Sequence, residues 1–119
     1  MSDRDGDRVE LIDDERIVPY GAARTTWFVR RGVSWVKAAE WPGATTERRD
    51  SGPGTVWERA VLVPLPPGTE LMRVETRPRK VAPVDPLSYL SRETRRPPRS
   101  TRRTRYRVEP GGRVRPVAG

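Results

Sequence analysis

The chain of 119 residues contains neither cysteine nor histidine. The lack of cysteine excludes disulfides, thiolate zinc sites and cysteine nucleophiles. The lack of histidine removes the usual general base of hydrolases, the centre of a Ser-His-Asp triad and a common metal ligand. Any catalysis would depend on carboxylates, lysine or tyrosine. We therefore expect a protein that is not an enzyme and that holds neither a metal nor a cofactor.

Apolar residues are scarce as well. Hydrophobic residues make up 34% of the chain and charged residues another 34%, which suits a single domain with one small core. The N-terminal segment is acidic and has no apolar run, and no stretch approaches the roughly 18 apolar residues of a membrane-spanning helix. These absences predict a cytoplasmic protein that does not contact membranes.

Two short segments resemble ligand-binding motifs without completing them. Counting from Asp3, a calcium loop needs glycine at its sixth position and glutamate at its twelfth, where this chain has Arg8 and Asp14. The segment 52–54, GPG, lacks the GK[ST] ending of a phosphate-binding loop. The carboxylates at 13–15 are better explained as surface charges that pair with arginines. The sequence therefore carries no motif that identifies a family.

What the sequence has in excess is arginine. Its 24 basic residues comprise 22 arginines and two lysines, against 16 acidic residues, and the net charge is +8. Residues 1–15 are acidic, whereas residues 92–119 carry ten arginines and two glutamates. The preference for arginine reflects either GC-rich codon usage or selection for bidentate contacts with phosphate or carboxylate groups. The asymmetry indicates either a contact between the two ends or a basic arm for an anionic partner.

Alternation of apolar and polar residues predicts a mainly β fold. The strongest signal lies in residues 55–77, which read TVWERAVLV, PLPPG and TELMRVETR. Because the prolines of PLPPG forbid a helix, this pattern predicts two strands joined as an antiparallel hairpin. Arg31–Gly32 is expected to form a tight turn, and residues 44–54 an exposed loop. Further short strands are expected at residues 8–12, 16–20, 25–30 and 33–38.

The last third of the chain is expected to differ from this β unit. Asp85 and Pro86 are typical of a helix start and predict a short helix over 85–91. Arginine fills half of the positions from 92 to 107, and Pro97–Pro98 favours an extended conformation there. Strand-like alternation in residues 104–108 and 113–117 predicts a terminal hairpin.

The predicted fold is a small antiparallel open barrel or rolled sheet with one short helix and an extended basic C-terminal arm that ends in a hairpin. Its expected parts are an acidic N-terminal segment (1–7), a small β domain (8–84), the helix (85–91) and the arginine-rich arm (92–119).

The arginine-rich arm is the strongest functional signal. It predicts a non-enzymatic basic accessory protein that binds DNA or RNA through arginine–phosphate contacts, largely without sequence preference. The alternative is a structural or assembly protein, for example of a viral particle or multiprotein complex, whose charged termini bind acidic surfaces of neighbouring subunits, including further copies of itself. Either partner would be held by the same side chains: Arg92, Arg95, Arg96, Arg99, Arg102, Arg103, Arg105, Arg107, Arg113 and Arg115.

Aromatic residues supply a second candidate contact. The chain has four tryptophans and one phenylalanine, and most of the tryptophans are expected to fill the small core. Trp41, beside Pro42–Gly43, and Tyr106, within the arginine-rich arm, are the candidates for stacking on nucleic-acid bases.

Overall fold

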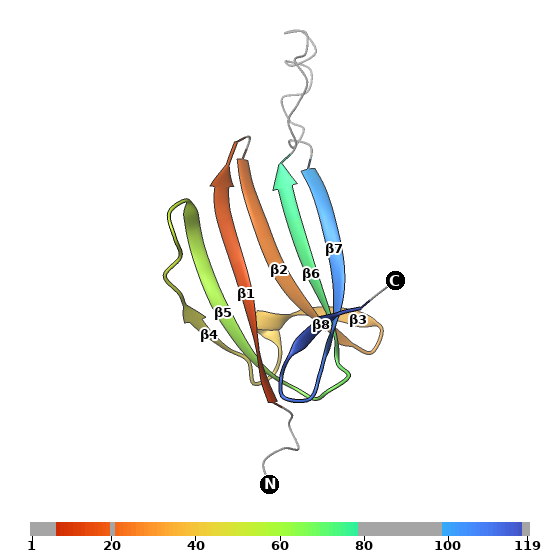
Figure 1. Cartoon of the computed structure of the whole chain (residues 1–119). Helices are drawn as coiled ribbons and strands as arrows, with labels where there is room; N and C mark the ends of the chain where they lie inside the picture. Colours follow the sequence, from red (N-terminus) through yellow and green to blue (C-terminus); the bar gives the residue numbers. More distant parts are fainter. Residues whose placement is uncertain (1–6, 20, 79–98, 118–119) are drawn as a thin grey trace.

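The computed structural model describes residues 7–19, 21–78 and 99–117, and most of them lie in one antiparallel sheet (Figure 1). The eight strands are ordered β4-β5-β1-β2-β6-β7-β8, with β3 paired to β2 off this path. The sheet curves into a half-barrel, so the expected mainly β, rolled architecture is confirmed. The elements are β1 (Asp7–Val18), β2 (Gly21–Arg31), β3 (Ser34–Lys37), the 3-10 turn η2 (Ala38–Glu40), β4 (Thr45–Arg48), β5 (Thr55–Leu65), β6 (Glu70–Pro78), β7 (Arg99–Val108) and β8 (Val114–Pro116).

Strand β2 changes its partner along one edge. At one end it pairs with β1, from Val18–Gly21 to Asp14–Thr25. At the other end the same edge pairs with β3, from Phe28–Lys37 to Arg31–Ser34. β1 meanwhile stays paired with β5 as far as Asp7. The sheet therefore divides into two groups of strands, β4-β5-β1 and β3-β2-β6-β7-β8.

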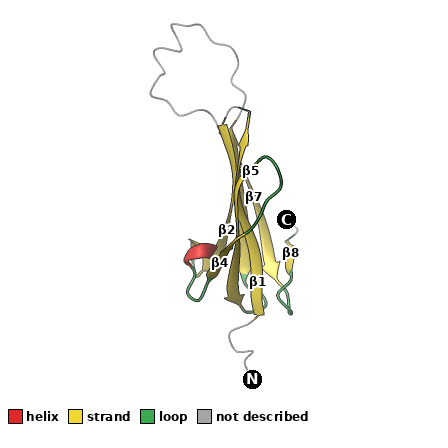
Figure 2. Cartoon of the chain, turned by 90° about the vertical axis from the view of Figure 1, so that its left-hand side faces the viewer, coloured by secondary structure: helices red, strands yellow, loops and turns green. Residues whose placement is uncertain are grey.

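The core lies between these two groups. On β1 and β5 the register places Val9 opposite Val63 and Leu11 opposite Val61, and all four side chains are buried. Figure 2 shows η2 on one side of the sheet and β8 on the other. Each fully buried valine or leucine contributes about 1.5–3 kcal/mol relative to exposure, so a small cluster suffices for a domain of this size. The buried cluster comprises Val9, Leu11, Trp27, Val29, Ala38, Val61, Val63, Leu65, Leu71 and Val108.

The predicted hairpin over residues 55–77 is wrong in its pairing. Both strands exist, as β5 and β6, but β5 pairs with β1 and β4, whereas β6 pairs with β2 and β7. The proline-rich connection thus crosses from one group of strands to the other, and Gly68, at its end, donates its N–H to the carbonyl of Val108 at 2.7 Å. Alternation along a strand specifies which side chains share a face, but it does not specify the neighbouring strand.

Other boundaries also differ from expectation. The two strands expected at 8–12 and 16–20 are one continuous strand, β1, and the expected loop over 44–54 contains β4. The tight turn expected at Arg31–Gly32 lies one residue later, at Gly32 and Val33, because Arg31 still pairs with Ser34. Gly32 has a φ of 63°, a conformation that favours glycine. β3 ends at Lys37, and η2 begins at the next residue, Ala38. The expected helix over 85–91 lies outside the described residues.

The arginine-rich segment was expected to form an arm outside the β domain. From Arg99 onwards it instead forms strand β7, which pairs with β6 from Pro78–Arg99 to Glu70–Arg107. The expected terminal hairpin is present as β7 and β8, with Val108 opposite Val114. β7 joins the sheet because β6 offers it a free edge and because Val108 is buried in the core.

Candidate nucleic-acid interface

Most arginines of β7 share one face of the sheet. Side chains alternate between faces along a strand, so Arg99, Arg103, Arg105 and Arg107 lie on one face and Arg102 lies on the other. Arg102 shares its face with the alternating residues Thr104 and Tyr106, of which Tyr106 contacts the core. The other four arginines therefore project away from the core and are exposed.

The same face continues across the neighbouring strands. The register places Arg105 opposite Met72, Met72 opposite Phe28, and Phe28 opposite Lys37. Arg115 on β8 lies opposite Arg107. We call this surface the basic face. It comprises Arg30, Trp35, Lys37, Arg99, Arg103, Arg105, Arg107 and Arg115, around the half-buried apolar side chains of Phe28, Met72 and Val74.

Two guanidinium groups of the basic face lie near the ring of Trp35. The Cζ atoms of Arg30, on the neighbouring strand β2, and of Arg105, on β7, are each 5.8 Å from its ring centroid. Both distances are within the range of cation–π attraction. The one carboxylate that the register places on this part of the sheet, Glu70, forms an ion pair with Arg30 at 3.5 Å. Trp35 itself is half-buried.

The arginines of β7 differ in their ion pairing from several arginines elsewhere in the sheet. Arg16, Arg24, Arg30, Arg49 and Arg59 each pair with a carboxylate. Within the described part of the chain, no arginine of β7 does so. Their charge is therefore balanced only by solvent ions, which a phosphate backbone would displace with a gain in entropy.

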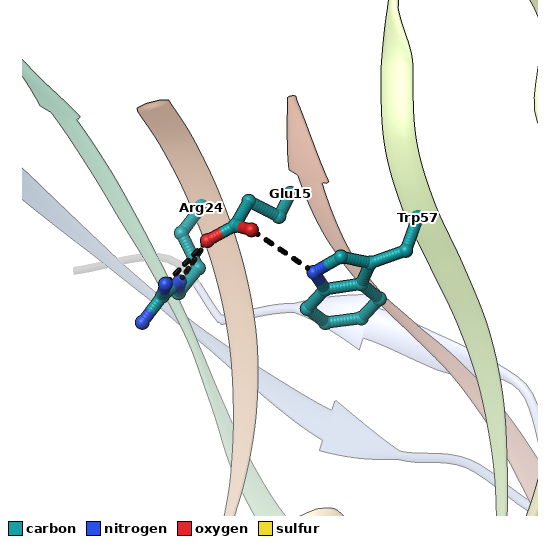
Figure 3. Close-up of polar contacts among 3 residues, drawn as sticks. All are labelled: Glu15, Arg24 and Trp57. Atoms are coloured by element: carbon teal, nitrogen blue, oxygen red, sulfur yellow. Dashed lines mark hydrogen bonds and ion pairs between the residues drawn. The ribbon is translucent and has the colours of Figure 1, made fainter. Parts of the chain in front are cut away.

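Glu15 contacts side chains of the two strands beside β1, Arg24 on β2 and Trp57 on β5 (Figure 3). One of its carboxylate oxygens accepts hydrogen bonds from both Nε and Nη2 of Arg24, the former at 3.0 Å. The other oxygen accepts the indole N–H of Trp57 at 3.2 Å. The hydrogen bonds from Arg24 and then from Trp57 lower the pKa of Glu15, so this carboxylate is charged at neutral pH. The charge of Arg24 is thereby offset by Glu15.

The two aromatic residues expected to stack on bases lie against the core. The ring of Tyr106 packs on that of Trp27, with centroids 4.9 Å apart. Arg73 covers both rings, its Cζ lying 5.3 Å from the centroid of Tyr106 and 5.9 Å from that of Trp27. Trp41 is half-buried and packs against the core cluster. The tryptophan that faces outward among the arginines is Trp35.

Trp35, Arg30 and Lys37 were not among the expected site residues. The expected turn at Arg31–Gly32 would have paired Arg30 with Val33, whereas the structure pairs Arg30 with Trp35. The remaining expected residues are dispersed. Arg113 is exposed between β7 and β8, and Arg115 on β8 forms an ion pair with Glu109 at 3.3 Å. Arg92, Arg95 and Arg96 lie outside the described residues.

A buried carboxylate, Asp13, occupies the point where β1 leaves β2. It is 3% exposed, accepts the backbone N–H of Trp27 at 2.9 Å and lies 3.7 Å from Nη2 of Arg59. Burial raises the pKa of Asp13 despite the hydrogen bond from Trp27 and the charge of Arg59, both of which lower it. Because its carboxylate replaces a backbone partner of Trp27, we assign it a structural role. Among the described residues no three acidic groups gather to form a metal site.

No family model, curated protein or solved structure matches the chain. No helix among the described residues has the length and apolar character needed to cross a membrane.

Proposed function

We propose that the protein is a non-enzymatic nucleic-acid-binding protein that contacts phosphates through the basic face. The observation that carries this proposal is that Arg99, Arg103, Arg105 and Arg107 project from one face of β7 and have no carboxylate partner among the described residues. Lys37 extends the positive charge across the sheet. Arginine forms bidentate contacts with phosphate, and several such contacts give strong, salt-dependent binding with little sequence preference.

The test compares two triple variants that lose the same charge. The first is Arg103→Ala/Arg105→Ala/Arg107→Ala on the basic face. The control is Arg16→Ala/Arg24→Ala/Arg49→Ala, whose guanidinium groups already pair with Asp14, Glu15 and Glu10. The affinity of each protein for DNA and RNA is measured by fluorescence anisotropy at several salt concentrations.

Each lost phosphate contact reduces the slope of log affinity against log salt by about 0.7–0.9, so the first variant is expected to lose about two units of slope. The control should keep most of the wild-type slope. If the wild-type protein binds no nucleic acid at about 50 mM salt, the proposal is wrong. An equal loss in both variants would show that total charge, and not the basic face, determines binding.

A second candidate function is assembly with other protein subunits, favoured by the outer edge of β7. β8 covers this edge only at Tyr106–Val108, and Val117 donates one further N–H to the carbonyl of Arg105. Along residues 100–104 the edge has no strand partner among the described residues. Such an edge can take up a strand from another chain, although exposed charges also protect edges against this. Light scattering at increasing concentration tests it, since a constant monomer mass with no co-purifying subunit would refute it.

A further inference from the structure

The basic face extends over five adjacent strands, β3-β2-β6-β7-β8, which lie about 4.8 Å from their neighbours. The one helical element that the structure describes is η2, with three residues. Reading the major groove of a duplex requires a helix or a two-stranded ribbon that enters it. A duplex on this face would thus be contacted only at its phosphates.

Apolar surface lies in the middle of the positive charge. Trp35, Phe28 and Met72 are each half-buried, and Phe28 and Met72 lie on the two strands between Trp35 and β7. A duplex keeps its bases inside the helical stack and has no apolar surface to place against these side chains. A single strand can turn its bases outward, and stacking on an aromatic ring is accessible to every base.

We infer that the basic face is a binding site for single-stranded nucleic acid, with one base stacked on Trp35 and the adjacent phosphates held by Arg103, Arg105 and Arg107. This inference rests on the function proposed above and specifies its ligand. Four-stranded antiparallel sheets hold about two or three stacked bases in known RNA-binding domains.

The two arginines beside Trp35 have different parts in this arrangement. Arg30 forms an ion pair with Glu70 and donates from Nε to the carbonyl of Gly32 at 2.9 Å, so its guanidinium is held beside the ring. Arg105 is exposed and has no carboxylate partner among the described residues. It can therefore leave the ring and bind a phosphate when a base takes its place. Arg30 then stays beside the ring.

The experiment compares a labelled single-stranded DNA of about 15 nucleotides with the duplex of the same sequence, at constant salt. The variants are Trp35→Ala, Trp35→Phe and the control Trp57→Ala. Trp57 is also half-buried and also lies beside an arginine, with Arg59 5.5 Å from its ring, but it is hydrogen-bonded to Glu15 outside the basic face. Circular dichroism and urea unfolding show whether each variant is folded.

The wild-type protein is expected to bind the single strand more tightly than the duplex. Trp35→Ala should weaken single-strand binding about 5- to 100-fold, leave duplex binding unchanged and leave the salt slope intact, because the stack carries no phosphate charge. Trp35→Phe should restore most of the affinity, and Trp57→Ala should have no effect.

Failure of this inference can be told apart from failure of the proposed function. Equal affinity for single strand and duplex, or a Trp35→Ala variant that binds the single strand like wild type, overturns the stacking site while salt-dependent binding stands. A Trp35→Ala variant that weakens both ligands equally also overturns it. If no nucleic acid binds to the wild-type protein at low salt, both are wrong.

Discussion

Replacing Asp13 separates the contribution of its hydrogen bond from that of its charge. The carboxylate accepts the backbone N–H of Trp27 at 2.9 Å, at the point where β1 no longer pairs with β2. In Asp13→Ala this N–H loses its acceptor in a buried environment. In Asp13→Asn the side-chain carbonyl can still accept the same hydrogen bond, while the negative charge is removed.

The structure sets the size of each effect. An unsatisfied buried N–H costs about 1–3 kcal/mol. The ion pair between Asp13 and Arg59 spans 3.7 Å and the Arg59 side chain is 43% exposed, so it contributes at most about 1 kcal/mol. Removing a buried charge offsets part of this loss. We therefore expect Asp13→Ala to lower the free energy of unfolding by about 2 kcal/mol, and Asp13→Asn to change it by less than about 1 kcal/mol.

Urea unfolding monitored by circular dichroism measures the difference. With a denaturant slope of about 1–3 kcal/mol per molar, the Ala variant should unfold about 1 M earlier than wild type, with an unchanged slope. If Asn costs as much as Ala, the charge and not the hydrogen bond stabilises this position. If neither variant loses stability, Trp27 finds another acceptor and the reasoning is wrong.

Three further predictions concern stability. Burial raises the pKa of Asp13 above its ordinary value of 3.8, so the folded state binds the carboxyl proton of Asp13 more tightly than the unfolded state does. Wild type should therefore lose stability relative to Asp13→Asn as the pH rises above 4, and urea midpoints between pH 4 and 7 measure this loss. Gly112→Ala should lower the melting temperature more than Gly68→Ala does. Both glycines have a positive φ, but only at Gly112 does an added Cβ meet a backbone oxygen, at 3.1 Å, and equal losses would contradict this. Leu71→Ala should cost about 2–5 kcal/mol in urea unfolding, whereas Val33→Ala, at a residue 94% exposed, should stay within about 0.5 kcal/mol; a Leu71 variant as stable as wild type would refute the assignment of the core.

The sequence predicts the strands better than their partners. The alternation of Trp57, Val61 and Val63 identifies β5, and Gly32 identifies the turn that follows β2, because both are local properties. The choice of β1 and β4 as neighbours of β5 depends on contacts between distant residues, which local alternation does not encode. The division of the sheet at Asp13 is likewise invisible in the sequence, where Asp13 reads as one surface acid among three.

The candidate site was predictable in composition but not in arrangement. The run of arginines indicates an anionic partner, but only the pairing of β7 with β6 shows which arginines share a face. Tyr106 was expected to stack because it lies among arginines. Its packing on Trp27 depends on the bend of the sheet. Trp35 becomes a candidate because Arg105, distant in sequence, lies beside it.

The position of β7 has a consequence for synthesis of the protein on the ribosome. β7 completes the edge of β6, and Val108 contributes to the core, while Gly111 donates its N–H to Asp7 near the other end of the chain at 3.0 Å. A nascent chain that ends at β6 would therefore leave that edge and Leu71 open to pairing with other chains. The sheet can be completed only after nearly all 119 residues have emerged, and contacts so distant in sequence form slowly.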